Sequence, residues 1–263
     1  MGRGYKIKKM FWTKQLKNHL NNSQKNWDGL AKTDPFWAIL TEQEKKGGKW
    51  NKNDFFATGV KEIEYLMTHL NQKEIQFSKL RALDFGCGVG RLTQPLSKYF
   101  NKVIGIDISP QMITLAENYN SKPNCQFVLN PTADIKLFHD NSFDFIYSNI
   151  VLQHITPDKV FDYLLEFIRI LRNDGLLIFQ LPDRFINPYV DVLRNNCFSQ
   201  KYLYRLYLFA KFGFKPVIET YCIKKNKIID FLNINGVSIL RMEENRNAGP
   251  KWISYTYYVR KSR

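Results

Sequence analysis

A short apolar stretch that ends in alternating glycines is the feature that most constrains this chain. The sequence RALDFGCGVG occupies residues 81–90 and places glycine at every second position, at Gly86, Gly88 and Gly90. Glycine adopts positive φ angles without strain and lets a ligand approach the backbone closely. The free N–H groups at the start of a following helix then offer hydrogen bonds to that ligand. The run therefore predicts a β-strand, a ligand-binding turn and a helix in succession.

The spacing and charge of this turn distinguish its ligand from a dinucleotide. A dinucleotide-binding turn has the pattern G-x-G-x-x-G, whereas Arg91 stands here in place of the third glycine. Asp84 precedes the first glycine by two residues. Because like charges repel, an acid at this position disfavours a pyrophosphate and favours an ammonium group. The turn is therefore interpreted as a site for a ligand with an amino-acid end and no phosphates.

The next segment is consistent with a small ligand that contains a ribose. Residues 102–106 predict a second strand that ends at Asp107, and Ser109 is placed to cap a helix with Pro110 at its first position. Asp107 lies 21 residues after Gly86. An acid at about this distance accepts hydrogen bonds from ribose hydroxyls.

Two later strands also lead into polar residues. A strand expected at 125–129 precedes a polar turn with Asp134, and a buried strand expected at 143–148 opens into Asn149 and His154. Alternation of strands and helices favours a parallel sheet that is covered on both faces. Ligands of such sheets bind outside the carboxyl ends of the strands, and every polar residue named so far falls at such an end.

The resemblance of the chain to a known family rests on DFGCGVGRL (84–92), VIGIDISPQMI (103–113), PTAD (131–134) and FDFIYSNIVLQHI (143–155). In this order they resemble the motifs of the class I S-adenosylmethionine (SAM) methyltransferases of the small-molecule type. The resemblance covers residues 53–183 well and the C-terminal third more weakly. It implies an α/β, Rossmann-like, seven-stranded mixed sheet whose last strand is antiparallel, with helices on both faces. It also implies SAM as cofactor and S-adenosylhomocysteine (SAH) as product.

The same resemblance assigns residues to the parts of SAM. The glycine turn and its acid would hold the methionine end, Asp107 would bind the ribose hydroxyls, and Asn149 would lie under the sulfonium. Residues next to these would contact the adenine, with Asp134 accepting from its amino group unless that side chain is a solvated loop acid. The cofactor residues assigned in this way are Asp84, Gly86, Cys87, Gly88, Gly90, Arg91, Asp107, Ile108, Met112, Ala133, Asp134 and Asn149.

The acceptor is expected to be a hydroxyl oxygen of a small molecule, such as a sugar or a lipid-linked glycan. Amino-group methylases of this superfamily carry Asn-Pro-Pro-Tyr after the fourth strand, where residues 148–151 read SNIV. His154 is the candidate general base, because an imidazole with an ordinary pKa near 6.5 removes protons near neutral pH. Alternatively, His154 only packs at a helix start under a lid. Its neighbour Gln153, where metal-dependent relatives place an acid, favours a site without a metal.

The resemblance and the composition suggest four segments. Residues 1–52 form an N-terminal helical extension or lid, 53–183 the SAM-binding core, 184–222 a helical lid insertion and 223–263 the remainder of the core. Strands are expected at 81–85, 102–106, 125–129, 143–148, 175–181, 237–243 and 252–261, and helices at 53–70, 90–99, 109–119, 157–171, 200–212 and 224–234.

The positive charge lies on the flanks of the chain. Residues 1–52 carry 12 Lys and Arg against 4 Asp and Glu, whereas residues 53–183 carry 12 against 15. Basic flanks are typical of simple solubilisation, but they also suit an anionic acceptor, a membrane surface or nucleic acid. The aromatic and basic helix expected at 200–212 is interpreted either as a lid helix that packs on the core or as a helix that lies on a membrane surface.

Two alternatives to a small-molecule methyltransferase remain open. The basic flanks allow an RNA methyltransferase, although no separate RNA-binding module is recognisable, and a SAM-binding regulatory protein without catalysis would keep the same motifs. Four scattered cysteines without metal spacing, and no apolar run of about 18 residues that could span a membrane, favour a cytoplasmic location. The sequence does not define the oligomeric state.

Overall fold

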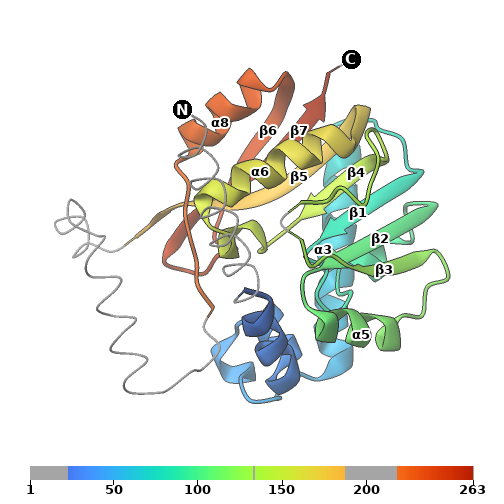
Figure 1. Ribbon diagram of the computed structural model, residues 1–263, viewed down its shortest axis with the longest axis vertical. Helices are drawn as coiled ribbons and strands as arrows, with labels where there is room; N and C mark the ends of the chain where they lie inside the picture. The colour runs from blue at the N-terminus through green and yellow to red at the C-terminus, as the bar shows by residue number, and fades with distance from the viewer. Residues whose placement is uncertain (1–22, 133, 187–217, 263) are drawn as a thin grey trace, which may run out of the picture.

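Seven strands form one mixed sheet in the order β3-β2-β1-β4-β5-β7-β6 in the computed structural model, which describes residues 23–132, 134–186 and 218–262 (Figure 1). Strands β1 to β5 pair in parallel, and β7 runs antiparallel to both of its neighbours. The expected Rossmann-like mixed sheet with an antiparallel last strand is thereby confirmed. The strands are β1 (Arg81–Phe85), β2 (Lys102–Asp107), β3 (Cys125–Leu129), β4 (Phe143–Ser148), β5 (Leu171–Phe185), β6 (Val237–Asn245) and β7 (Trp252–Lys261).

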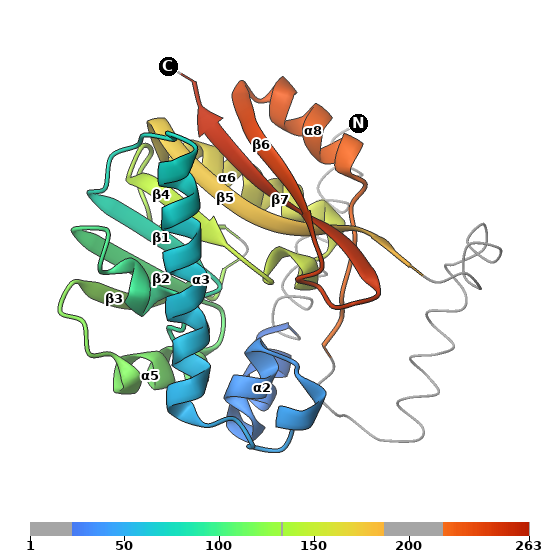
Figure 2. The ribbon, with the colours of Figure 1, turned by 180° about the vertical axis from the view of Figure 1, so that it is seen from behind.

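Helices cover both faces of this sheet (Figures 1 and 2). Residues 23–33 are also helical and, with α2, lie at the lower end of the molecule beside the start of α3 (Figure 1). The remaining elements are α2 (Pro35–Ile39), α3 (Lys52–Gln72), α4 (Thr93–Leu96), α5 (Pro110–Tyr119), α6 (Pro157–Ile170) and α8 (Lys225–Ile234), with 3₁₀ turns at η1 (Gln43–Lys45) and η2 (Leu152–His154).

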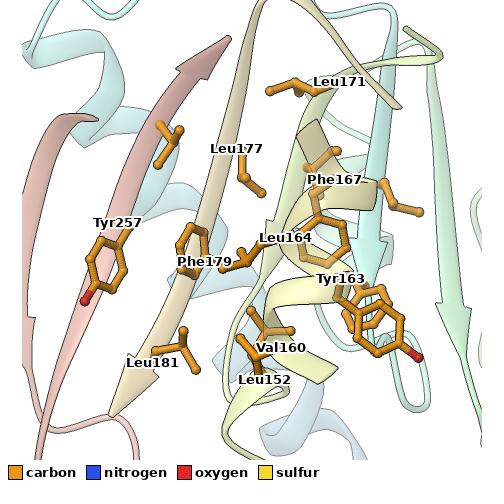
Figure 3. Close-up of a cluster of buried hydrophobic side chains, with 14 of the residues drawn as sticks. Leu152, Val160, Tyr163, Leu164, Phe167, Leu171, Leu177, Phe179, Leu181 and Tyr257 are labelled. Atoms are coloured by element: carbon orange, nitrogen blue, oxygen red, sulfur yellow. The ribbon is translucent and has the colours of Figure 1, made fainter. Parts of the chain in front are cut away.

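The core consists of two apolar layers, one on each face of the sheet. On one face, α6 directs Val160, Leu164 and Phe167 toward side chains of β5 and β7 such as Phe179 and Tyr257 (Figure 3). On the other face, α3 buries an apolar stripe at helical spacing against β1, β4 and β5 (Figure 2). Burial of each large side chain contributes about 1.5–3 kcal/mol, so these two layers hold the strand ends in fixed relative positions.

The structure follows the sequence expectations closely, with two differences. Ser109 caps α5 by accepting from the Met112 N–H at 3.1 Å, as expected. The helix expected at 90–99 is shorter in the structure, where α4 spans only Thr93–Leu96 and contains Pro95 in its first turn. Strand β5 begins at Leu171, before the expected residue 175, and its pairing with β4 is irregular near Asp174, which has a φ of 61°.

Several expectations lie outside the described residues. These are the helix at 200–212, most of the insertion at 184–222, the first part of the N-terminal extension and the adenine-side residue Ala133. Among the helices that the structure does describe, none is long and apolar enough to cross a membrane.

Candidate functional site

A cavity of about 340 Å³ lies at the carboxyl ends of β1, β2 and β4, where the sequence placed its polar residues. Part of the helix at 23–33 forms one of its walls. Ten of the predicted site residues line it, namely Asp84, Gly86, Cys87, Gly88, Arg91, Asp107, Ile108, Met112, Asn149 and His154, together with others that the sequence did not indicate, including Trp27, Asn130, Val151 and Lys159.

The first glycine of the turn is required by both its backbone and its surroundings. Gly86 has a φ of 75°, and the N–H groups of Gly86 and Cys87 both donate to the Ile106 carbonyl, at 2.8 and 3.0 Å. A Cβ atom at Gly86 would lie 2.4 Å from Cγ1 of Val151. The turn therefore bends back against β2 and leaves no room for a side chain at this point.

The other two glycines of the run differ in what they face. Gly88 has a φ of 52°, and a Cβ there would lie 2.6 Å from Cδ1 of Ile39 in α2. Gly90 has a φ of 82° but does not line the cavity, and a Cβ there would lie 2.8 Å from Cζ of Phe127. The structure thus places Gly86 and Gly88 at the cavity, whereas Gly90 lets the chain pack on β3.

Two carboxylates, the buried Asp84 and the half-buried Asp107, stand at the ends of adjacent strands. Burial raises the pKa of Asp84 to about 7, although the Thr93 hydroxyl donates to its carboxylate at 2.6 Å. Burial also raises the pKa of Asp107. The backbone N–H groups of Ser109 and Gly88, which donate to its carboxylate at 2.9 Å, oppose this shift. A carboxylate has about four acceptor sites, so Asp107 retains capacity for hydroxyl donors. A cationic ligand group would stabilise ionised Asp84.

The adenine-side residues divide between the cavity and the surface. Ile108 and Met112 line the cavity beside Asp107. Asp134 does not line it; its carboxylate is 40% exposed and pairs with Lys136 at 3.2 Å. Asn130, at the end of β3, lines the cavity instead. Sequence reasoning passed over Asn130, although it directly follows a predicted strand, as the other polar residues of the site do.

Arg91 and Asn149 both contact the carboxylate of Glu62, a residue that the sequence did not indicate. The Arg91 guanidinium pairs with Glu62 of α3 at 2.9 Å, and the Asn149 amide donates to the same carboxylate at 2.7 Å. Glu62 is the edge residue of the buried stripe of α3, between Gly59 and Ile63. A charged residue at the edge of an apolar helical stripe is the signal that could have indicated it.

Both ring nitrogens of His154 form hydrogen bonds within the protein. Its Nδ1 faces the Glu219 carbonyl, which only accepts, so this nitrogen carries the proton. Nε2 then accepts from the Gln153 amide at 3.2 Å. Burial lowers the pKa of His154 to about 4, so the ring is neutral at pH 7. Trp27 packs edge-to-face against the ring at a centroid distance of 5.2 Å.

The helix at 23–33 is bonded to the loop that follows β2. Gln24 donates to the Ile108 carbonyl at 2.9 Å, and the Ser109 hydroxyl donates to Asp28. These bonds fix Trp27 over the cavity, 80 residues from the loop in sequence. Among the described residues, no group of three or more His, Cys, Asp or Glu side chains is arranged to hold a metal ion.

A sheet of this order, with a glycine turn and acids at the ends of its first two strands, defines a Rossmann-like class I methyltransferase fold. Residues 83–179 match the family model described as "Methyltransferase domain". Trans-aconitate 2-methyltransferase of Escherichia coli (strain 55989) is 34% identical over 122 residues, which are 45% of this chain and 46% of that protein. The match thus spans less than half the length of that relative. Over this segment the chain is similar to class I SAM-dependent methyltransferases.

Solved structures share the fold over most of the chain. Magnesium protoporphyrin IX methyltransferase from Synechocystis PCC 6803, crystallised with bound SAH, has a TM-score of 0.56 and 20% identity over 87% of this chain and 98% of that one. The PH0226 protein from Pyrococcus horikoshii OT3 has a TM-score of 0.57 and 18% identity over 86% and 98%. Both similarities establish the fold.

Proposed function

We propose that this protein transfers the methyl group of SAM to an oxygen of a small-molecule acceptor. The observation that carries the proposal is the cavity in which Asp84, Asp107 and the glycine turn converge. The relatives are named for small-molecule methylation, of trans-aconitate and of magnesium protoporphyrin IX, which supports an acceptor of that size.

The residues of the cavity suit SAM. Asp84 is buried and needs a cationic partner to ionise fully at neutral pH, and the ammonium of a methionine end would provide one. Asp107 retains acceptor sites for two ribose hydroxyls, while Ile108 and Met112 offer apolar surface to a base. The same two carboxylates would repel the phosphates of a dinucleotide.

When bound, SAM supplies a methyl group on a sulfonium that already carries its leaving group. The protein then has to hold donor and acceptor in line and keep water out, and such alignment can contribute about 7–11 kcal/mol to lowering the barrier. The apolar side chains of Trp27, Ile39 and Val151 in the cavity wall serve that exclusion. Asn149 lines the cavity at the end of β4, where it would lie under the sulfonium.

We further propose that the acceptor oxygen is a hydroxyl and that His154 is its general base. The ring lines the cavity, its Nδ1–H is fixed by the Glu219 carbonyl, and Nε2 carries the lone pair that a base requires. The acceptor would displace the Gln153 amide from Nε2, which is 3.2 Å away. Lys159 lines the same cavity and offers a positive charge to an anionic acceptor.

The proposal is tested by incubating the protein with methyl-tritiated SAM and a panel of small molecules that carry hydroxyl or carboxyl groups. We expect label to enter one chemical class of the panel and to be lost in Asp107→Ala. An RNA sample in the same assay tests whether the basic flanks of the chain indicate an RNA acceptor. Transfer to RNA alone, or binding of SAM without transfer to any acceptor tested, would contradict the proposal in favour of the two alternatives.

A further inference from the structure

A hydrogen-bonded cluster on the α3 face of the sheet joins the end of β4 to the glycine turn. Glu62 of α3 lies at its centre. One carboxylate oxygen accepts from the Tyr147 hydroxyl at 2.9 Å and from the Asn149 amide at 2.7 Å. The other pairs with the Arg91 guanidinium at 2.9 Å. Tyr147 and Asn149 lie in and directly after β4, and Arg91 follows the glycine turn after β1. The Glu62 carboxylate therefore joins α3, β4 and the turn after β1.

This cluster fixes which end of the Asn149 amide points at Glu62. A carboxylate only accepts hydrogen bonds, so the group that faces Glu62 must be the NH₂ of Asn149. The amide oxygen is therefore directed away from α3, and Asn149 lines the cavity. Among the described residues, this oxygen accepts from the Asn247 amide at 3.4 Å, which is long for a hydrogen bond.

The cluster is held firmly in one arrangement. The Arg91 side chain is 4% exposed and that of Glu62 is 25% exposed, so solvent competes little for their ion pair. Burial and the adjacent Glu62 raise the pKa of Tyr147 well above its usual value, so the phenol stays a donor. Arg91 also donates to the Thr58 hydroxyl at 3.3 Å. Rotation of the Asn149 amide would set its oxygen against a carboxylate, which is unfavourable.

We propose that Glu62 is a positioning residue that makes the end of β4 selective for the cationic sulfonium of SAM over the neutral thioether of SAH. This inference rests on the proposed function. Glu62 acts through the cavity-lining Asn149, because it holds the NH₂ of that amide toward α3 and leaves the negative end of the amide dipole directed away from α3. SAM and SAH share their ammonium, carboxylate, ribose and adenine, so the ratio of their affinities reports on the sulfonium position alone. A protein with this preference retains the methyl donor and releases the product.

Glu62→Gln is the test, because glutamine keeps the size of the side chain and can turn either end of its amide toward Asn149. Calorimetric titration of the purified protein with SAM and, separately, with SAH gives the two dissociation constants. We expect the ratio of SAH to SAM dissociation constants to fall about fivefold in Glu62→Gln. Glu64→Gln is the matched control, since Glu64 lies on the same helix and pairs with Lys98 at the surface. It should leave the ratio unchanged.

Asn149→Ala provides a second route to the same answer if Glu62→Gln folds poorly. It should lower the ratio by a similar factor, and Glu62→Gln combined with Asn149→Ala should lower it no further, because the two residues act in series. Equal weakening of both ligands in Glu62→Gln, or an unchanged ratio in Asn149→Ala, would overturn the inference. Failure of the unmodified protein to bind either ligand would instead overturn the proposed function on which it rests.

Discussion

The two halves of the cavity are built in different ways. Most of the donor half comes from one continuous stretch of chain, in which β1, the glycine turn, β2 and the start of α5 lie in order between Arg81 and Met112, and only Asn130 and Asn149 are added from later strand ends. The acceptor half joins Trp27, His154 and Glu219, which are far apart in the sequence. A site of local origin can be recognised from its motif, whereas a site of distant parts depends on how the chain folds over itself.

The halves also differ in their electrostatics. Burial raises the pKa values of the two donor-half carboxylates, so a cationic ligand gains by restoring their charge. In the acceptor half, burial lowers the pKa of His154 to about 4 and keeps it neutral. The comparison therefore predicts that donor-half substitutions change cofactor affinity, whereas acceptor-half substitutions change turnover.

The largest effect is expected in the acceptor half. His154→Ala should lower methyl transfer to the acceptor found in the tritium assay by about 10²–10⁴-fold, because it removes a general base. Its SAH affinity, measured by calorimetry, should stay within about twofold, since the donor half is untouched. The pH profile of the unmodified enzyme should show no inflection near 6.5 from this ring, which is already neutral there. Full turnover in His154→Ala would refute the assignment.

Asp107→Ala should weaken SAH binding by about 100-fold, because it removes the acceptor of the ribose hydroxyls and frees the N–H groups of Gly88 and Ser109. Asp134→Ala is the matched control. Its carboxylate pairs with Lys136 and does not line the cavity, so the SAH affinity of this variant should change by less than about threefold. Similar losses in both variants would mean that the adenine side of the site includes Asp134 after all.

The raised pKa of Asp84 predicts that the affinity for SAH depends on pH. With a pKa of about 7 in the free protein and a lower one beside an ammonium group, SAH affinity should rise about tenfold from pH 6 to pH 8. The folded protein holds this proton more tightly than the unfolded chain, so the contribution of Asp84 to stability falls as pH rises toward and through 7. Asp84→Asn should abolish the pH dependence of binding and raise the melting temperature at pH 8. A pH-independent affinity in the unmodified protein would contradict this role.

Asp28→Ala should have the smallest effect, a loss of about threefold in SAH affinity. Asp28 does not line the cavity, but it accepts from the Ser109 hydroxyl and from the Gln111 N–H at 3.2 Å. Its loss should loosen the helix at 23–33 from the loop that carries Ile108. Calorimetry measures the change, and an effect as large as that of Asp107→Ala would show that the two halves are not separate.

The donor half could be predicted from the sequence because its determinants are local. The positive φ angles at Gly86 and Gly88 and the cap at Ser109 each depend on a few neighbouring residues. The helix expected at 90–99 was too long, since only Thr93–Leu96 is helical. The seven-stranded mixed sheet with its antiparallel last strand, by contrast, came from the family resemblance.

The missed residues of the site depend on tertiary packing. Glu62 reaches Asn149 across 87 positions, and no local pattern connects them. Trp27 reads as one of many aromatics in a basic segment, and Asn130 reads as a loop residue. Their positions follow from the docking of α3 on the sheet and of the helix at 23–33 on the loop after β2, which a sequence pattern does not specify.

Calorimetric titration of the unmodified protein at pH 8, with SAH and in a separate run with NAD⁺, tests the central claim most directly. The carboxylates of Asp84 and Asp107 and the G-x-G-x-G turn predict one SAH bound per chain and no binding of NAD⁺, whose pyrophosphate would lie against Asp84. Binding of NAD⁺ without binding of SAH would contradict the account.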